Sequence, residues 1–471
     1  MPIVPRLPGC ALALALLSGC GAGGDPRLLI VTTDDVAGKT SPCGCHTPKG
    51  GLARRAAFLD SVRAEHRAVL VLDAGGFFPA TDAEREAGPF MMRAMARLGT
   101  RAAGVGANEL RSGYAFVREQ ARAARLPLVC TNLVEFASGR PAFEPWRVFH
   151  VGGLDVGVFG LIAESTDLGP ARDSLRIEPA EDAARRAVST LRRQGADVVV
   201  LLSQLGMTMG DSVANHVPGI DLVVGGGGVP ALPSGVPVGG AVALHGGTQG
   251  WQVGVANVFP GRVGRPARIE ARTVILGPDV KTQPAMAASV KAFEDSLDAH
   301  LRLRNAAEAG AAARRIRPGG SGPHYLGMSR CISCHPSEYA QWRTTAHARA
   351  WRTLVDQHKS STPACVSCHV TGFGEPGGFR VADDIRGDAA RLGDVQCEAC
   401  HGMGSGHEDW IGTGRKVLES TCRACHTDIT SPTFSLAQYR PHVVHNPPPG
   451  LTPLPEAPAH KLMQAGKRLH P

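Results

Sequence analysis

Four copies of the pattern Cys-x-x-Cys-His lie in the last third of the chain, and they define the chemistry that this sequence can support. Two cysteines at this spacing lie about one helical turn apart, so both thiols can add to the vinyl groups of a haem while the adjacent histidine ligates the iron. The pattern predicts four covalently attached haem c groups. The predicted attachment residues are Cys331, Cys334, Cys365, Cys368, Cys397, Cys400, Cys422 and Cys425, and the proximal iron ligands are His335, His369, His401 and His426.

Structural zinc is the alternative, because paired cysteines with nearby histidines also form zinc sites. A zinc ribbon uses two cysteine pairs for each metal ion and does not require a histidine directly after the second cysteine of every pair. That histidine is present in all four copies. The repeated spacing therefore favours haem attachment and a tetrahaem c-type cytochrome.

The sequence around the motifs resembles the tetrahaem cytochrome c-554 family. Four segments carry the resemblance: His324-Tyr325, Glu338-Tyr339-x-x-Trp342, His347-Ala348-x-Ala350, and Cys397-Glu398-Ala399-Cys400-His401-Gly402 with His407 after it. The resemblance implies a second axial histidine on some or all of the irons, which suits outer-sphere electron transfer. It also implies that one haem can be five-coordinate and open to a small molecule. The distal candidates are His324, His347, His407, His442 and His445, and the iron that each one reaches stays open.

The N-terminus predicts export. An apolar run from Ala11 to Leu17 is too short to span a bilayer and is typical of a secretory signal. The sequence Leu17-Ser18-Gly19-Cys20 resembles a bacterial lipobox, which implies cleavage after residue 19 and lipidation of Cys20. An ordinary signal peptide cut nearby is the alternative. We expect a protein that faces the periplasm from a bacterial membrane, the outer membrane or the cell surface included.

Composition limits the remaining possibilities. A chain of 471 residues with 43% hydrophobic residues can form two domains, each with its own core. The formal net charge is +8, but four haems would add roughly eight propionate carboxylates. We therefore predict no nucleic-acid partner. The expected partners are redox proteins and a membrane reached through the N-terminal lipid, and the oligomeric state stays open.

The segment before the haem motifs has the pattern of an α/β layered domain. Short apolar runs predict buried strands, longer periodic segments predict helices, and two glycines inside 146–162 predict a hairpin. An amphipathic stripe from Met286 to Leu301 then predicts a helix that leads into a Pro-Gly linker. The expected strands are 28–31, 69–72, 198–202 and 222–224, and the expected helices are 53–65, 84–98 and 182–193.

The predicted organisation has six parts. A signal peptide (1–19) and a tether (20–27) precede an α/β layered domain (28–280). A helix and linker (281–321) lead to a mainly α-helical, loop-rich multihaem cytochrome c domain (322–446). A proline-rich tail (447–471) follows.

The order of motifs in the first domain resembles the calcineurin-like metallophosphatase fold, in its 5'-nucleotidase branch. That family holds two metal ions that activate a water for attack on phosphate. Asp35 keeps the first carboxylate, but Ala37 and Gly76 stand where the family has a histidine and the bridging aspartate. No confident dinuclear metal site remains, so we expect this domain to be inactive as a phosphatase. The degenerate site is assigned to Asp35, Asp73, Asn108 and Gln204.

One loop of this domain has reactive side chains. Cys43, Cys45 and His46 could bind a soft metal, act as a redox pair or lend a ligand to a cofactor. The alternative is a structural loop in which one of the two thiols is bridged to Cys130. The other histidines of the domain, His66, His150, His216 and His245, are interpreted as surface residues or as core residues with satisfied hydrogen bonds.

These observations leave three hypotheses for function. The favoured one is an exported tetrahaem electron carrier whose phosphoesterase-like domain is a binding or interaction platform. The first alternative is an oxidoreductase of small nitrogen or sulfur oxides that acts at a five-coordinate haem. The second alternative is a residual metal-dependent phosphoesterase. The electron donor and acceptor stay open.

Overall fold

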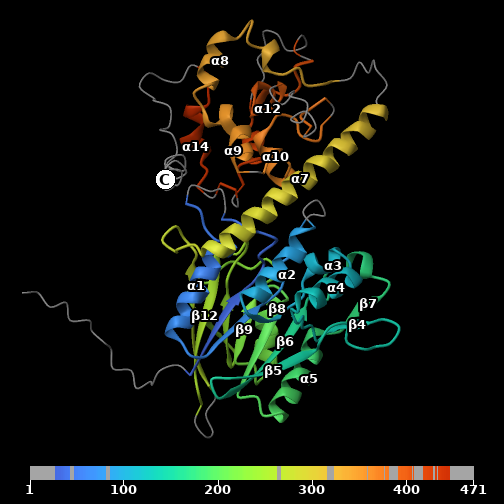
Figure 1. The fold of residues 1–471 in the computed structure, drawn as a ribbon, viewed down its shortest axis with the longest axis vertical. Helices are drawn as coiled ribbons and strands as arrows, with labels where there is room; N and C mark the ends of the chain where they lie inside the picture. Colours follow the sequence, from blue (N-terminus) through green and yellow to red (C-terminus); the bar gives the residue numbers. More distant parts are fainter. Residues whose placement is uncertain are drawn as a thin grey trace, which may run out of the picture.

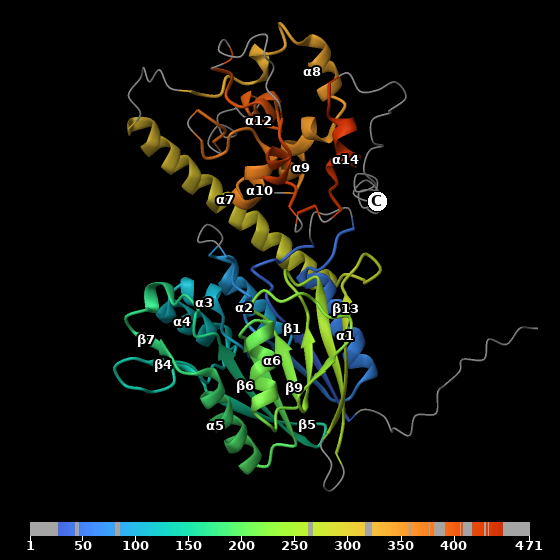
Figure 2. The same ribbon diagram turned by 180° about the vertical axis from the view of Figure 1, so that it is seen from behind.

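The computed structural model describes residues 27–42, 47–80, 85–261, 267–315, 323–357, 359–375, 377–380, 391–405, 407, 417–427, 430–431 and 433–445. These residues form a layered α/β domain and a loop-rich domain with short helices, and one long helix, α7, runs between them (Figures 1 and 2). In this part of the chain no helix combines the length and the apolar character needed to cross a bilayer. Cys20, the predicted signal and tail, and the Pro-Gly linker lie outside the described residues.

Two sheets form the centre of the α/β domain. The five-stranded sheet has the order β13-β12-β1-β2-β3, and the six-stranded sheet has the order β10-β11-β9-β8-β6-β5. The first sheet contains β1 (Leu28–Thr33), β2 (Val69–Asp73), β3 (Thr100–Ala103), β12 (Gln252–Phe259) and β13 (Arg268–Ile275). The second contains β5 (Trp146–Val151), β6 (Leu154–Ile162), β8 (Val198–Gln204), β9 (Leu222–Gly225), β10 (Val236–Val238) and β11 (Ala241–His245). A separate two-stranded sheet pairs β4 (Leu133–Glu135) with β7 (Leu175–Ile177).

The apolar strands are buried on both faces, which explains their continuous hydrophobic runs. Successive side chains of a strand point to opposite faces. On β1, Leu28 and Ile30 face the other sheet, whereas Leu29 and Val31 face helices. The outer layers are formed by α1 (Leu52–Glu65), α2 (Ala87–Arg97), α3 (Ala107–Arg111) and α4 (Tyr114–Ala124) on the first sheet, and by α5 (Ala180–Arg193) and α6 (Met207–His216) on the second.

Parallel pairing brings the carboxyl ends of the central strands together. β1 pairs parallel with β2 in the first sheet, and β8 pairs parallel with both β6 and β9 in the second. Asp73 ends β2 and Gln204 ends β8. The polar residues that follow these strands therefore meet at one edge of the domain.

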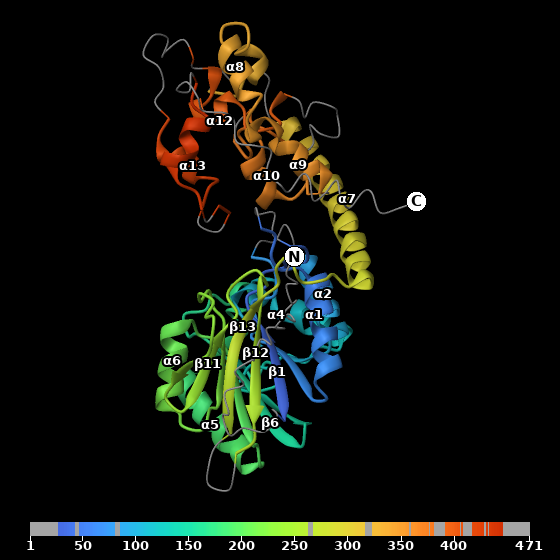
Figure 3. The same cartoon turned by 90° about the vertical axis from the view of Figure 1, so that its left-hand side faces the viewer.

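The helix α7 (Pro284–Arg315) is shared by the two domains. On the α/β side, the Phe293 ring stacks on Phe90 with centroids 4.1 Å apart, and Glu294 accepts a hydrogen bond from the Thr40 hydroxyl. Further along the helix, the buried Asp298 accepts a hydrogen bond from the backbone N–H of Ser361 in the loop-rich domain. Figure 3 shows α7 along one side of the molecule, reaching from the α/β domain past α9 and α10.

The second domain consists of short helices. They are η3 (Met328–Arg330), α8 (Pro336–Trp342), η4 (Ala346–Arg349), α9 (Ala350–Asp356), α10 (Pro363–His369), α12 (Cys397–His401), α13 (Glu419–Arg423), α14 (Leu436–Tyr439) and η7 (Arg440–His442). A small core packs between α9, α10 and the adjoining loops, with Trp351 and Phe379 in ring contact. A domain with so small a protein core needs further packing partners to be stable.

The expected fold class is confirmed. The predicted strands correspond to β1, β2, β8 and β9, and the predicted helices correspond to α1, α2 and α5. The predicted hairpin is the antiparallel pair β5 and β6, which turns at Gly152 and Gly153, both at positive φ. The amphipathic stripe from Met286 to Leu301 lies within α7, which continues to Arg315. The start of the stripe, Met286 and Val290, is buried in the core between the first sheet and its helices. The strands β3, β4, β7 and β10 to β13 and the helices α3, α4 and α6 were not predicted individually.

Candidate functional sites

The four Cys-x-x-Cys-His motifs lie on or beside short helices of the second domain. The first motif lies between η3 and α8, the second ends α10, the third forms α12, and the fourth begins within α13. The thiols of Cys331 and Cys397 lie close enough to shift each other's pKa, and so do those of Cys368 and Cys425. The first and third motifs are therefore neighbours, as are the second and fourth.

Three of the motif histidines face another histidine. The ring centroids of His335 and His407 are 6.2 Å apart, those of His426 and His347 are 6.2 Å apart, and those of His401 and His445 are 6.1 Å apart. Imidazole nitrogens bind a first-row metal at about 2.0 Å, so two rings on opposite sides of one metal have centroids roughly 6 Å apart. Each pair therefore has the spacing that a six-coordinate haem iron requires.

Two motif histidines are oriented by hydrogen bonds at Nδ1. His369 Nδ1 lies 2.8 Å from the carbonyl oxygen of Ala350, and His426 Nδ1 lies 2.9 Å from the Ser431 hydroxyl. A carbonyl only accepts, so Nδ1 of His369 carries the proton and Nε2 has the lone pair for a metal. Burial lowers the pKa of His347 and of His426, which favours the neutral imidazole that metal ligation needs.

His369, the histidine of the second motif, has a different environment from the other three motif histidines. Within the described residues, no histidine ring faces His369 in the way that the other three motif histidines are faced. For two of the five distal candidates, the described residues show no ring contact with a motif histidine. His324 donates its backbone N–H to Ser405 Oγ, and the Nδ1 of His442 is buried without a hydrogen-bond partner in the described part of the chain.

A carboxylate that sequence reasoning did not single out ties the motifs together. Glu398, inside the third motif, is buried and accepts backbone hydrogen bonds from Leu326 (2.9 Å), Gly327 (2.7 Å) and Gly404 (2.6 Å). The segment before the first motif is thereby fixed to the third. The signal in the sequence was a charged residue between the two cysteines of a motif, where nothing in haem attachment requires one.

In the α/β domain, the residues assigned to the degenerate phosphatase site meet at the carboxyl edge of the sheets. Asp35 accepts hydrogen bonds from Gln204 Nε2 (3.0 Å) and from the backbone N–H of Gly228 (2.7 Å). A β-carbon added at Gly76 would collide with the Asp35 carboxylate. Asn108 Nδ2 instead donates to the carbonyl oxygen of Phe78 at 3.1 Å. Asp35 is thus in contact with both Gln204 and Gly76, and Asn108 points to the neighbouring loop.

Glu109 fills the space next to this group, and the sequence analysis did not select it. Its carboxylate is fully buried and accepts backbone hydrogen bonds from Gly76 (3.0 Å), Phe78 (2.8 Å) and Gly106 (2.7 Å). Burial raises the pKa of Glu109, while the three N–H donors act in the opposite direction. This carboxylate holds together the two loops that follow β2 and β3.

Asp73 belongs to a second, deeper cluster. Asp34, Asp73 and Arg55 are all buried, so two acids share one cation. Burial raises the pKa of Asp73 to about 7 and raises the pKa of Asp34 well above its ordinary value, although Arg55 opposes both shifts. Asp73 accepts hydrogen bonds from Thr33 Oγ1 and from the N–H of Gly75. Over the described residues, no three histidine, cysteine or acidic side chains converge in a way that could hold a metal ion.

Two expectations for this domain require correction. Cys130 is a free thiol in the first core, and its burial raises its pKa to about 12, against the alternative of a disulfide at this residue. His245 is buried and its Nδ1 lacks a partner among the described residues, so it is not a satisfied core histidine.

His150 and His216 are exposed and pair with Asp155 and Glu181, as expected of surface residues. Cys43, Cys45 and His46 lie outside the described residues.

The comparisons with known proteins identify two classes. Residues 330–402 match the family model for cytochrome c554 and c-prime. The α/β sheets have the fold of 5'-nucleotidases and related metallophosphatases, and the chain therefore combines a 5'-nucleotidase-like fold with a cytochrome c554-like domain. The second domain implies covalently bound haem c and haem-based electron transfer.

Three particular relatives represent these classes. The cytochrome c-554 of Nitrosomonas europaea is 37% identical over 95 residues, which cover 17% of this chain and 39% of that protein. The 5'-nucleotidase of Vibrio cholerae is 25% identical over 249 residues, covering 48% of this chain and 44% of that protein. The crystal structure of a 5'-nucleotidase precursor from Thermus thermophilus has a TM-score of 0.53 at 25% identity, covering 58% of this chain and 59% of that chain. The chain spans less than half the length of the two curated relatives.

Proposed function

We propose that this protein is an exported electron carrier with four covalently bound haem c groups, joined to a phosphoesterase-like domain that has no phosphatase activity. The observation that carries the proposal is the set of three facing histidine pairs, with ring centroids 6.1 to 6.2 Å apart. In this proposal His335 and His407 hold one iron, His426 and His347 a second, and His401 and His445 a third.

An iron with two histidine ligands has no free coordination position, so it exchanges electrons without binding a substrate. The contacts between motifs support a relay. Cys331 meets Cys397, and Cys368 meets Cys425, so haems attached at the members of each pair would be close neighbours. The partners in this proposal are redox proteins that donate and accept electrons.

The haem that would be attached at the second motif, with His369 as its ligand, supports a second candidate function. His369 has its Nδ1 proton directed to Ala350, which leaves Nε2 for iron, but no histidine ring among the described residues faces it. A haem with one protein ligand has an open position for a small molecule. Reduction or oxidation of a small nitrogen or sulfur oxide at that position is therefore the alternative to a simple relay.

The α/β domain is proposed to be a binding or interaction platform. Two-metal hydrolysis needs several carboxylates and histidines around two ions. Here Asp35 is engaged by Gln204 and Gly228, and the adjoining loops are held by Glu109. Hydrogen bonds within the protein thus occupy carboxylate oxygens that metal ions would need as ligands. A residual phosphoesterase activity is not favoured by this arrangement.

The cellular location is also part of the proposal. The signal-like N-terminus and the lipobox-like sequence before Cys20 support export and a lipid anchor, with the protein facing the periplasm from a bacterial membrane. Covalent haem attachment agrees with an exported protein. We propose no nucleic-acid partner and no dinuclear metal centre.

Electron paramagnetic resonance of the oxidised, haem-loaded protein tests the proposal. Low-spin signals from at least three haems per chain are expected, and one high-spin ferric haem per chain would identify His369 as the ligand of an open haem. The variant His407→Ala should convert one low-spin haem to high spin, because the iron held by His335 loses its second ligand. The control His150→Ala, which changes an exposed histidine of the α/β domain, should leave the spectrum unchanged. An unchanged spectrum of His407→Ala would refute the assignment.

A further inference from the structure

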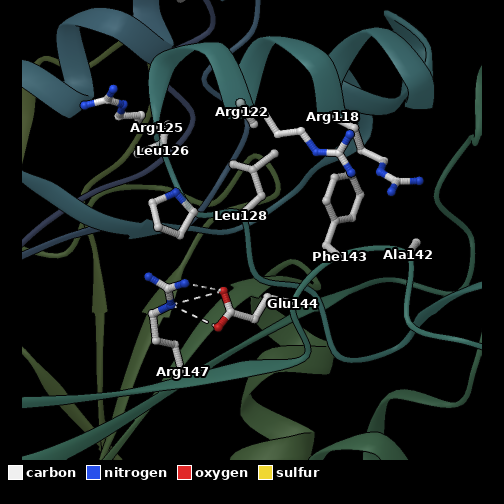
Figure 4. Close-up of a pocket in the computed structure, with 11 residues that line it drawn as sticks. Arg118, Arg122, Arg125, Leu126, Leu128, Ala142, Phe143, Glu144 and Arg147 are labelled. Atoms are coloured by element: carbon white, nitrogen blue, oxygen red, sulfur yellow. Dashed lines mark hydrogen bonds and ion pairs between the residues drawn. The ribbon is translucent and has the colours of Figure 1, made fainter.

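The α/β domain has a cleft that is lined by neither Asp35 nor Gln204. It lies between α4, the segment that follows this helix, and the start of the edge strand β5, and its volume is about 490 Å³ (Figure 4). Its floor is apolar and includes Leu126, Leu128 and Phe143. Four arginines surround the floor: Arg118, Arg122 and Arg125 from the α4 side, and Arg147 from β5.

The four guanidinium groups are not equivalent. Arg147 forms a two-pronged ion pair with Glu144, both oxygens 3.0 Å from its Nε. Arg118 donates to the Tyr114 hydroxyl at 3.0 Å and lies 3.6 Å from Glu135. Arg122 and Arg125 are exposed, and neither has an ion pair or side-chain hydrogen bond within the described residues. Among the described residues that line the cleft, Glu144 is the one acidic side chain, so the cleft has an excess of positive charge.

This arrangement has a cost in stability. Arg118 and Arg122 are four positions apart on one helix, where like charges destabilise by a few tenths of a kcal/mol. Arg125 follows α4 in the left-handed conformation, with φ of 55°, where glycine or asparagine is preferred. The negative end of the helix dipole offsets part of the repulsion. Two unpaired guanidinium groups beside an apolar floor nevertheless match a ligand that combines negative charge with an apolar body.

We propose that this cleft binds a small organic anion, a phosphate ester or carboxylate that carries an aromatic or aliphatic group. The apolar group would lie on Leu128 and Phe143, and the anionic group would pair with Arg122. Arg125 points away from Leu128 in Figure 4, and its exposed side chain would turn toward the cleft to reach the same anionic group. The volume falls in the range of small-molecule clefts, and a largely apolar lining with a few directed polar groups is typical of them. Figure 4 shows Leu128 between the arginines of α4 and the Arg147 and Glu144 pair. The proposal does not depend on haem chemistry or on the strand-end cluster.

Isothermal titration calorimetry of the haem-loaded protein tests this site with three probes. Phenyl phosphate carries both features, inorganic phosphate only the charge, and benzyl alcohol only the ring. We expect phenyl phosphate to bind at least about tenfold more tightly than either of the others. A peptide of glutamate residues with one phenylalanine tests the other class of ligand, an acidic polypeptide, and tighter binding of this peptide than of phenyl phosphate would overturn the proposal.

Two substitutions locate the binding. Arg125→Gly removes a charge at a backbone position that favours glycine, so the fold should be unaffected, and Arg122→Ala removes the second unpaired charge. Each is expected to weaken phenyl phosphate binding about tenfold, because a charged hydrogen bond contributes about 1.5 kcal/mol or more. The matched control is Arg93→Ala, on the exposed face of α2. Equal affinity in wild type, both variants and the control would place any binding elsewhere and refute the inference.

Discussion

Glu109→Gln tests whether one buried carboxylate holds the loops at the strand ends. The amide that replaces the carboxylate has one acceptor instead of two. In its better orientation, the remaining oxygen still accepts from Gly76 and Gly106, but the new NH₂ group then faces the N–H of Phe78. Two buried donor groups, the new side-chain NH₂ of the variant and the Phe78 N–H, are then left without an acceptor.

Each unsatisfied buried group costs about 1–3 kcal/mol, so the loss is about 2–6 kcal/mol. Removing a buried charge returns part of this, since burial raises the pKa of Glu109. We expect a net loss of about 3 kcal/mol. For a domain of this size, 1 kcal/mol corresponds to about 2–4 °C, so the melting temperature of the α/β domain should fall by about 6–12 °C.

Differential scanning calorimetry of the haem-loaded protein measures this shift. The control is Glu119→Gln, which makes the same change of charge on the exposed face of α4 and should leave the melting temperature within about 1 °C. If the two variants melt within about 2 °C of each other, the carboxylate of Glu109 does not stabilise these loops, and the explanation of the strand-end cluster is wrong.

Three further predictions concern the buried acids, the shared helix and the haems. Asp73 has a pKa raised to about 7 in the folded protein, so its contribution to stability is complete below pH 4 and is lost as the pH rises through 7. In Asp73→Asn the loss of unfolding free energy between pH 4 and pH 8, measured with urea, should be smaller by roughly 4 kcal/mol. Asp298→Ala leaves a buried N–H of the haem domain without an acceptor and should increase the radius of gyration measured by X-ray scattering, whereas the exposed Lys291→Ala should not; equal radii would contradict the role given to α7. Replacing Cys365 and Cys368 together by Ala should lower the haem content measured as pyridine haemochrome from four to three per chain, and a content that stays unchanged would show that this motif carries no haem.

The α/β fold could be predicted because its strands are buried on both faces. The strand β1 has no polar residue over its first four positions. A short, continuous apolar run of this kind is typical of a strand that is buried on both faces. The strand β13 was harder to recognise because it is half exposed at the edge of its sheet, and its alternation of polar and apolar residues is interrupted. Local sequence therefore identified the centre of the sheets better than their edges.

The haem-site histidines show a different limit. Spacing alone identified His335, His401 and His426, but their facing histidines lie between 44 and 79 positions away along the chain, as the numbers of His445, His407 and His347 show. No local propensity determines which distant loop closes on which motif. Glu109 was not predicted because the family resemblance assigned the site to its neighbour Asn108. In the structure Asn108 donates to Phe78, and the buried Glu109 accepts the hydrogen bonds of the surrounding loops.

The position of α7 has a consequence for how this protein can be divided. The helix has 32 residues and is roughly 48 Å long at 1.5 Å per residue. Its first half completes the apolar core of the α/β domain through Met286 and Val290, and Asp298, further along, completes the hydrogen bonding of the haem domain. A cut before the helix deprives the first domain of part of its core, and a cut after it leaves a polar group of the second domain without its acceptor. The two domains should therefore be expressed and exchanged together with α7 as one unit, although each resembles a different class of protein.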